Sequence, residues 1–132
     1  SFVKADVARD REQFDVHEIA FDRFNSSQLV TDLQGEGVTM VGFGQGFGSM
    51  SAPIKELERL YMSHRLAHGG NKVLRWMASN VVATRDPADN VKFDRARSTQ
   101  KIDGMVAVAM ALGRAIATHD DEGEHEEGFV AL

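Results

Sequence analysis

The chain contains no cysteine, so disulfides, thiolate zinc sites and a cysteine nucleophile are all excluded. It also has no apolar run approaching the roughly 20 residues that cross a bilayer. The first residues show neither a basic start nor an apolar segment, so we expect no signal peptide. An initial Met is missing as well, which suggests a piece cut from a longer protein.

A strong charge of one sign is also lacking outside the last residues. The net charge is −5. Six acidic residues lie within 119–128, and without them residues 1–118 carry +1. Neither value is the strongly basic balance of a dedicated nucleic-acid binder. We therefore expect one folded body over residues 1–118 and a disordered acidic tail over residues 119–132.

Short apolar segments alternate with helical patterns in the first part of the chain. Residues 2–15 are typical of a short surface helix. A strand over residues 17–22, a helix capped near Ser27 and a second strand over residues 38–41 follow closely. Strand, helix and strand at this spacing predict a parallel crossover unit.

The rest of the chain predicts helices around one hairpin. A helix is expected to begin at Ser51, with a proline in its first turn, and Asn71 is expected to cap a shorter one with Trp76 in the core. Turn residues near Asp86 predict a hairpin before a basic connector. Residues 103–118 are apolar on most sides, which indicates a long buried helix. We therefore expect an α/β fold, a partial mixed sheet flanked by helices.

Two aspartates stand where elements begin or end. Asp22 terminates a predicted strand, and Asp103 opens the long helix. Sites in open α/β sheets form beyond the carboxyl ends of strands, and paired carboxylates there suit Mg²⁺ or Mn²⁺. Spacing alone favours a simpler interpretation of Asp103, as a helix cap or first-turn acid stabilised by the helix dipole.

Other motifs point to no specific chemistry. The glycines of residues 42–48 miss the register of a dinucleotide fingerprint, and no P-loop follows, so a mobile loop is expected. His64 and His68 are spaced for zinc, but Arg65 stands where a metalloprotease has glutamate. No hydrolase triad can be identified. The connector residues Arg95, Arg97 and Lys101 suit phosphate contact and an ordinary solvated connector equally well.

Taken in order, several segments resemble one known family, the C-terminal nuclease domain of tailed-phage terminase large subunits, and the chain resembles the second half of that domain. The matching segments, spread over residues 17–117, are Ile19-Ala-Phe-Asp22, Val41 to Gly46, Ser51 to Leu60, His68-Gly-Gly-Asn71, Val73-Leu74-Arg75-Trp76, Asn80, and Arg97-Ser-Thr-Gln-Lys-Ile-Asp-Gly104 running into Val106-Ala107. Each motif is weak alone, but the series is specific.

The resemblance implies a ribonuclease H-like, metal-dependent endonuclease that cuts double-stranded viral DNA during packaging in the host cytoplasm. Three acids would hold two Mg²⁺ or Mn²⁺ ions; Asp22 matches the second and Asp103 the third, while the first lies upstream of this chain. Arg95, Arg97 and Lys101 would contact DNA, and His68 and Asn71 would organise loops. The terminase small subunit and the portal protein are the implied partners, with no membrane involved.

An alternative remains open at this point. Because the first acid is missing, the chain can also be interpreted as a non-catalytic module that grips DNA or docks within the packaging motor, or as an inactive prophage remnant.

Overall fold

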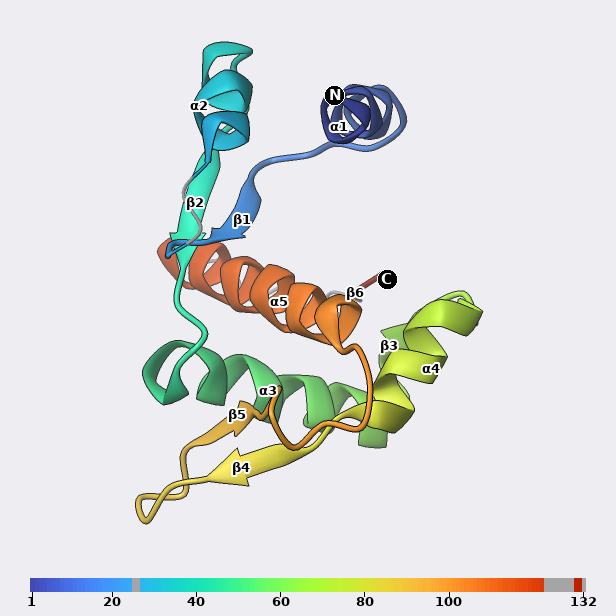
Figure 1. Ribbon diagram of the computed structural model, residues 1–132, viewed down its shortest axis with the longest axis vertical. Helices are drawn as coiled ribbons and strands as arrows, with labels where there is room; N and C mark the ends of the chain where they lie inside the picture. Colours follow the sequence, from blue (N-terminus) through green and yellow to red (C-terminus); the bar gives the residue numbers. More distant parts are fainter. Residues whose placement is uncertain (25–26, 123–129, 132) are drawn as a thin grey trace. The chain divides into compact units, whose positions relative to one another are not determined.

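The computed structural model describes residues 1–24, 27–122 and 130–131, with side chains described as far as His119. The chain divides into two compact units, Ser1–Gly44 and Gln45–Leu132. Figure 1 shows the helices and strands of each unit. Each unit is described by itself below.

The unit Ser1–Gly44 contains a parallel crossover. Its elements are α1 (Phe2–Gln13), β1 (Ile19–Asp22), α2 (Gln28–Gly35) and β2 (Met40–Phe43). β1 and β2 pair in parallel, with Asp22 opposite Phe43. The crossover predicted from the sequence is confirmed. A small apolar core is formed by Val30 and Leu33 of α2 and by Val38, which lies shortly before β2.

Helix α1 lies on the surface of this unit, as its mixed sequence predicted. None of its residues is buried. Polar contacts attach it instead. Lys4 forms an ion pair with Asp32 of α2 at 2.5 Å, and Arg11 donates a hydrogen bond to the Glu36 carbonyl at 3.4 Å.

The unit Gln45–Leu132 is built mainly from helices. These are α3 (Phe47–Met62), α4 (Lys72–Asn80) and α5 (Asp103–Glu122). α3 packs along α5, and their buried leucines Leu57, Leu60 and Leu112 form a core cluster. Partly buried side chains surround this cluster, among them Leu66, Phe93, Met105, Val108 and Ile116. The long helix predicted to lie in a core is therefore confirmed.

The strands of this unit are short. β4 (Ala83–Arg85) and β5 (Val91–Phe93) pair antiparallel as the predicted hairpin, and β5 packs on α3. Two strands that the pattern did not predict, β3 (Leu66–Ala67) and β6 (Val130–Ala131), pair in parallel. Within the described residues, each strand has a single neighbour. The expectation of one mixed sheet is thus wrong, since strands of two to four residues form three separate pairs.

Two helix boundaries differ from the prediction. α3 begins at Phe47, so Pro53 lies inside the helix rather than in its first turn. Burial of Met50 in the core stabilises the extra turn, and tertiary packing outweighs the local proline signal. α5 continues to Glu122, four residues past the predicted end at Thr118. The predicted disorder of the tail otherwise falls largely on residues 123–129, which lie outside the described residues.

Trp76 is not a core residue, contrary to expectation. Its side chain is 46% exposed, and Val73 beside it is also exposed. α4 faces α5 with a different stripe, Leu74 and Met77, which approach Gly104 at the start of α5. The helical spacing of apolar residues thus predicts the helix α4 correctly, but it does not predict which face of α4 packs on α5. None of the described helices combines the length and apolarity needed to span a membrane.

Candidate functional site

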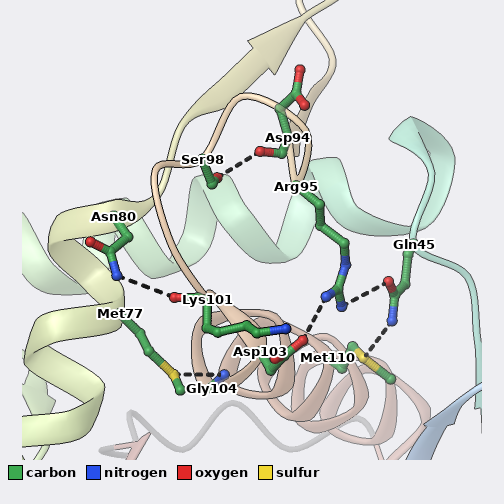
Figure 2. Close-up of polar contacts among 10 residues, drawn as sticks. All are labelled: Gln45, Met77, Asn80, Asp94, Arg95, Ser98, Lys101, Asp103, Gly104 and Met110. Atoms are coloured by element: carbon green, nitrogen blue, oxygen red, sulfur yellow. Dashed lines mark hydrogen bonds and ion pairs between the residues drawn. The ribbon is translucent and has the colours of Figure 1, made fainter.

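Asp103 is the first residue of α5. The preceding residue, Ile102, is buried and anchors the start of the helix, while the Asp103 side chain remains 59% exposed. Its Oδ1 atom accepts a hydrogen bond from Arg95 at 2.6 Å, and the two side chains form an ion pair (Figure 2). This position fits both a first-turn acid stabilised by the helix dipole and a metal ligand, since a first-turn acid can also offer oxygen atoms to a cation.

The cations around Asp103 keep its carboxyl group ionised. The hydrogen bond from Arg95 lowers the pKa of Asp103 most; burial raises it to a lesser extent, and the charges of Arg95 and Lys101 lower it further. Figure 2 shows the Lys101 side chain extending over the start of α5 toward Asp103. A carboxylate is therefore present here at neutral pH.

A contact that the sequence did not predict lies on the other side of Arg95. Its second terminal nitrogen donates to Gln45 Oε1 at 3.3 Å, and Gln45 Nε2 lies 3.9 Å from the Met110 sulfur (Figure 2). Gln45 precedes α3 and is fifty positions from Arg95. The sequence singles out Gln45 only as part of the matching segment Val41 to Gly46, because no local spacing indicates so distant a partner.

The connector between β5 and α5 is held by hydrogen bonds at both ends. Buried Asn80 donates to the Lys101 carbonyl at 3.3 Å and accepts from Thr99 at 3.4 Å. Ser98 donates to the Asp94 carbonyl at 2.6 Å and accepts from the Val82 amide at 3.2 Å. These bonds fix the backbone that presents Arg95, Lys101 and Asp103.

The predicted basic cluster is divided in the structure. Arg95 and Lys101 belong with Asp103, whereas the Arg97 side chain forms a long ion pair with Asp94 at 3.7 Å. Asp94 also accepts hydrogen bonds from the Thr84 hydroxyl at 2.8 Å and the Arg97 amide at 3.1 Å. The Thr84 bond lowers the pKa of Asp94 most.

A hollow of about 290 Å³ adjoins Arg95. Gln45, Lys92 and Asp94 also line it, with apolar side chains beneath. A larger and more apolar hollow of about 720 Å³ lies between α3, α4 and α5, and it includes neither Arg95 nor Asp103. The smaller hollow thus carries two cationic side chains, Lys92 and Arg95, together with the Asp94 carboxylate.

Asp22 belongs to the other unit. It is the last residue of β1 and partly buried, and its Oδ1 atom accepts a hydrogen bond from the Phe24 amide at 3.1 Å. This turn fixes the carboxylate at the carboxyl end of the strand, where the sequence predicted a site.

The donor types of these two aspartates fit a hard divalent cation, because Mg²⁺ and Mn²⁺ prefer carboxylate oxygen. Among the residues that the structure describes, no three acids, histidines or cysteines come together as a ligand group. Asp22 and Asp103 belong to different units of the chain.

The other motifs have structural roles. Gly46 is the residue before α3, and Gly42 and Phe43 belong to β2, so residues 44–46 alone of the glycine-rich segment lie outside a helix or strand. The spacing of His64 and His68 suggests a shared helix. In the structure both lie beyond the end of α3, outside any helix. His68 Nδ1 accepts from the Gly70 amide at 3.1 Å. Asn71 caps α4 by accepting from the Leu74 amide at 3.0 Å, which confirms the predicted cap.

The fold and site define a mixed α/β chain with one acid, Asp22, at the end of a strand and another, Asp103, at the start of a helix beside basic side chains. Residues 5–119 match the model of the family described as terminase large subunit, endonuclease domain. The chain therefore belongs to the family of terminase large-subunit endonuclease domains, and the resemblance drawn from its motifs is confirmed.

Two known proteins and one solved structure are similar to this chain. Over 98% of its length the chain is 38% identical to the large terminase subunit of Enterobacteria phage HK97, and over 86% it is 36% identical to protein YmfN of Escherichia coli strain K12. It covers 26% of each. The crystal structure of the HK97 bacteriophage large terminase superposes with a TM-score of 0.78 and 40% identity, covering 86% of this chain and 24% of that one.

Proposed function

We propose that this chain is the nuclease part of a phage DNA-packaging protein and cleaves double-stranded DNA with the help of Mg²⁺ or Mn²⁺. Membership of the endonuclease-domain family supports the reaction class. The observation that carries the proposal to particular residues is the ionised Asp103 at the start of α5, which pairs with Arg95 and lies within the electrostatic influence of Lys101. A carboxylate set among cations suits a site where metal and phosphate meet.

Each candidate residue has a distinct task under this proposal. Asp22 and Asp103 offer the oxygen atoms that hold the metal, as direct ligands. The bound metal supplies a water of lowered pKa and neutralises charge on the scissile phosphate. Arg95, Arg97 and Lys101 contact the DNA backbone and fix its position, because phosphate contacts set register without reading sequence. Asn80 and Ser98 hold the connector that presents them.

The setting of this activity is also part of the proposal. The chain spans about a quarter of the length of the curated relatives that it matches. We propose a ribonuclease H-like arrangement of the site, double-stranded DNA as substrate, the terminase small subunit and the portal protein as partners, and the host cytoplasm as the location.

A plasmid-nicking assay tests the activity. Supercoiled DNA and Mn²⁺ are incubated with the wild-type chain and with the Asp22→Asn and Asp103→Asn variants. The wild type is expected to nick the plasmid, EDTA to stop it, and each variant to lose at least about 100-fold, because a metal ligand is removed. Cleavage that survives both substitutions would reject the proposed site.

A second function is favoured by one specific observation. The described residues contain no group of three ligating side chains. A non-catalytic module that grips DNA needs only the basic residues around the connector. Such a module would bind DNA in a salt-dependent way and cut it under no metal condition, so the binding and nicking assays together separate the two functions.

A further inference from the structure

We propose that Arg95 is an exchangeable counterion, which holds Asp103 in the metal-free protein and moves to a DNA phosphate when a divalent cation binds Asp103. This inference rests on the proposed function and adds a regulation of its site. It starts from the observation that Asp103 Oδ1 is already in use, with an Arg95 nitrogen 2.6 Å away.

The guanidinium and the cation compete for the same carboxylate. A Mg²⁺ ion binds carboxylate oxygen at about 2.1 Å, so a guanidinium left in place would stand within a few ångströms of a divalent charge. Repulsion at that distance is strong even with partial solvent screening. The ion pair is also easy to open, because Arg95 is 51% and Asp103 59% exposed, and exposed pairs contribute little stability.

The displaced guanidinium has a destination. Arg95 lines the hollow of about 290 Å³, whose wall also carries Lys92, Gln45 and Asp94, the last of which pairs with Arg97. The two cationic side chains outnumber the one carboxylate at this hollow, and the planar arginine fork can bind two phosphate oxygens at once. The same side chain can thus serve the carboxylate first and the DNA backbone afterwards.

Gln45 is the positioning residue for this exchange. Its Oε1 atom accepts from the second nitrogen of Arg95, while its Nε2 atom contacts the Met110 sulfur of α5. The amide is therefore oriented with its oxygen toward the arginine (Figure 2). Because Gln45 contacts a different nitrogen from the one that serves Asp103, it can retain the guanidinium near the hollow after the ion pair opens.

The experiment measures Mn²⁺ affinity of the 132-residue chain without DNA, by electron paramagnetic resonance of free Mn²⁺. Arg95→Gln removes the competing charge and is expected to tighten Mn²⁺ binding about two- to fivefold. Arg95→Lys is expected to bind Mn²⁺ much as the wild type does, since it keeps the charge. Arg85→Gln is the matched control: Arg85 is 51% exposed like Arg95 but pairs with Asp89 and not with Asp103, so the Mn²⁺ affinity should not change.

The second measurement is DNA affinity against salt concentration at fixed Mn²⁺. Arg95→Gln is expected to weaken binding and to lower the salt slope by about one, as for one lost phosphate contact. Gln45→Ala tests the positioning role. It should weaken DNA binding while leaving Mn²⁺ affinity nearly unchanged, because the carboxylate and its competing charge both remain.

The outcomes separate this inference from the proposed function. If Asp103→Asn abolishes Mn²⁺ binding but Arg95→Gln leaves it unaltered, the exchange is overturned and the metal site stands. If the Asp103→Asn variant binds Mn²⁺ like the wild type, or if no form binds Mn²⁺, the site and the exchange fail together. Circular dichroism of each variant confirms that the compared proteins are folded.

Discussion

At the scale of single residues, Asn80 links α4 to the connector that carries the site. Asn80→Leu keeps the size of this buried side chain but leaves the Lys101 carbonyl without its donor. We expect the free energy of unfolding to fall by about 1–3 kcal/mol, the cost of a lost buried hydrogen bond. Urea denaturation measures it. Ser79→Ala, on the neighbouring and exposed position, should change stability by less than about 0.5 kcal/mol; equal effects would deny Asn80 its linking role.

Asp94 makes the stability of the folded chain depend on pH. Its pKa is lowered, mainly by the Thr84 hydroxyl, so the folded state favours the charged form more than the unfolded state does. The stabilisation is present above the ordinary carboxyl pKa and is lost as the pH falls through the lower folded value, below about pH 4. Thr84→Val should therefore be less stable than the wild type near pH 7, with the difference shrinking at about pH 3. A difference of constant size from pH 7 to pH 3 would show that the hydroxyl acts by packing alone.

The sequence predicts which residues belong to the site, but not which side chains they contact. Asp22 and Asp103 stand out because each marks the boundary of an element, and the structure places both at such boundaries. The Arg95–Asp103 pair spans eight positions of connector, and Gln45 joins from fifty positions away. Contacts of this kind depend on how the connector is held by Asn80 and Ser98, which local periodicity does not encode.

At the scale of elements, the start of α5 depends on close contact with α4. A Cβ atom on Gly104 would lie 2.8 Å from the Met77 sulfur and 3.3 Å from a Leu74 methyl group. Gly48 occupies the same second position in α3, and nothing lies within 4 Å of its Cβ direction. The two glycines are therefore a matched pair that differs in the space around them.

Gly48→Ala is expected to stabilise the chain by up to about 1 kcal/mol through helix propensity. Gly104→Ala gains the same propensity but must displace Met77, so it should be about 1–3 kcal/mol less favourable than Gly48→Ala. Thermal and urea unfolding give the comparison. Adding Met77→Ala should reduce the gap, because the crowded sulfur is removed. Equal stabilities of the two alanine variants would show that Met77 of α4 moves aside with no loss of stability.

Element types were more predictable than element boundaries. The parallel crossover, the hairpin and the cap at Asn71 all follow from local chemistry, namely turn residues, caps and apolar alternation. The early start of α3 follows instead from burial of Met50, and β3 depends on pairing with β6 from the far end of the chain. Such features are decided by tertiary contacts, which outweigh a single proline or a two-residue apolar segment.

At the scale of the whole molecule, each of the two units supplies one of the proposed metal ligands, Asp22 and Asp103. A cation that binds only the folded chain raises its stability by mass action, by about 2.7 kcal/mol at 100 times the Kd. Mn²⁺ is therefore expected to raise the melting temperature of the wild type in a concentration-dependent way. Calorimetry with increasing Mn²⁺ measures this shift.

Asp22→Asn and Asp103→Asn should each remove most of the Mn²⁺ shift, because each substitution removes a proposed metal ligand. Asp32→Asn is the control for a lost carboxylate in the first unit, since Asp32 pairs with Lys4 and not with the site; it should lower the melting temperature slightly and keep the full shift. If Asp22→Asn also keeps the full shift while Asp103→Asn loses it, the metal depends on the second unit alone, and Asp22 is then a turn-forming residue that holds Phe24.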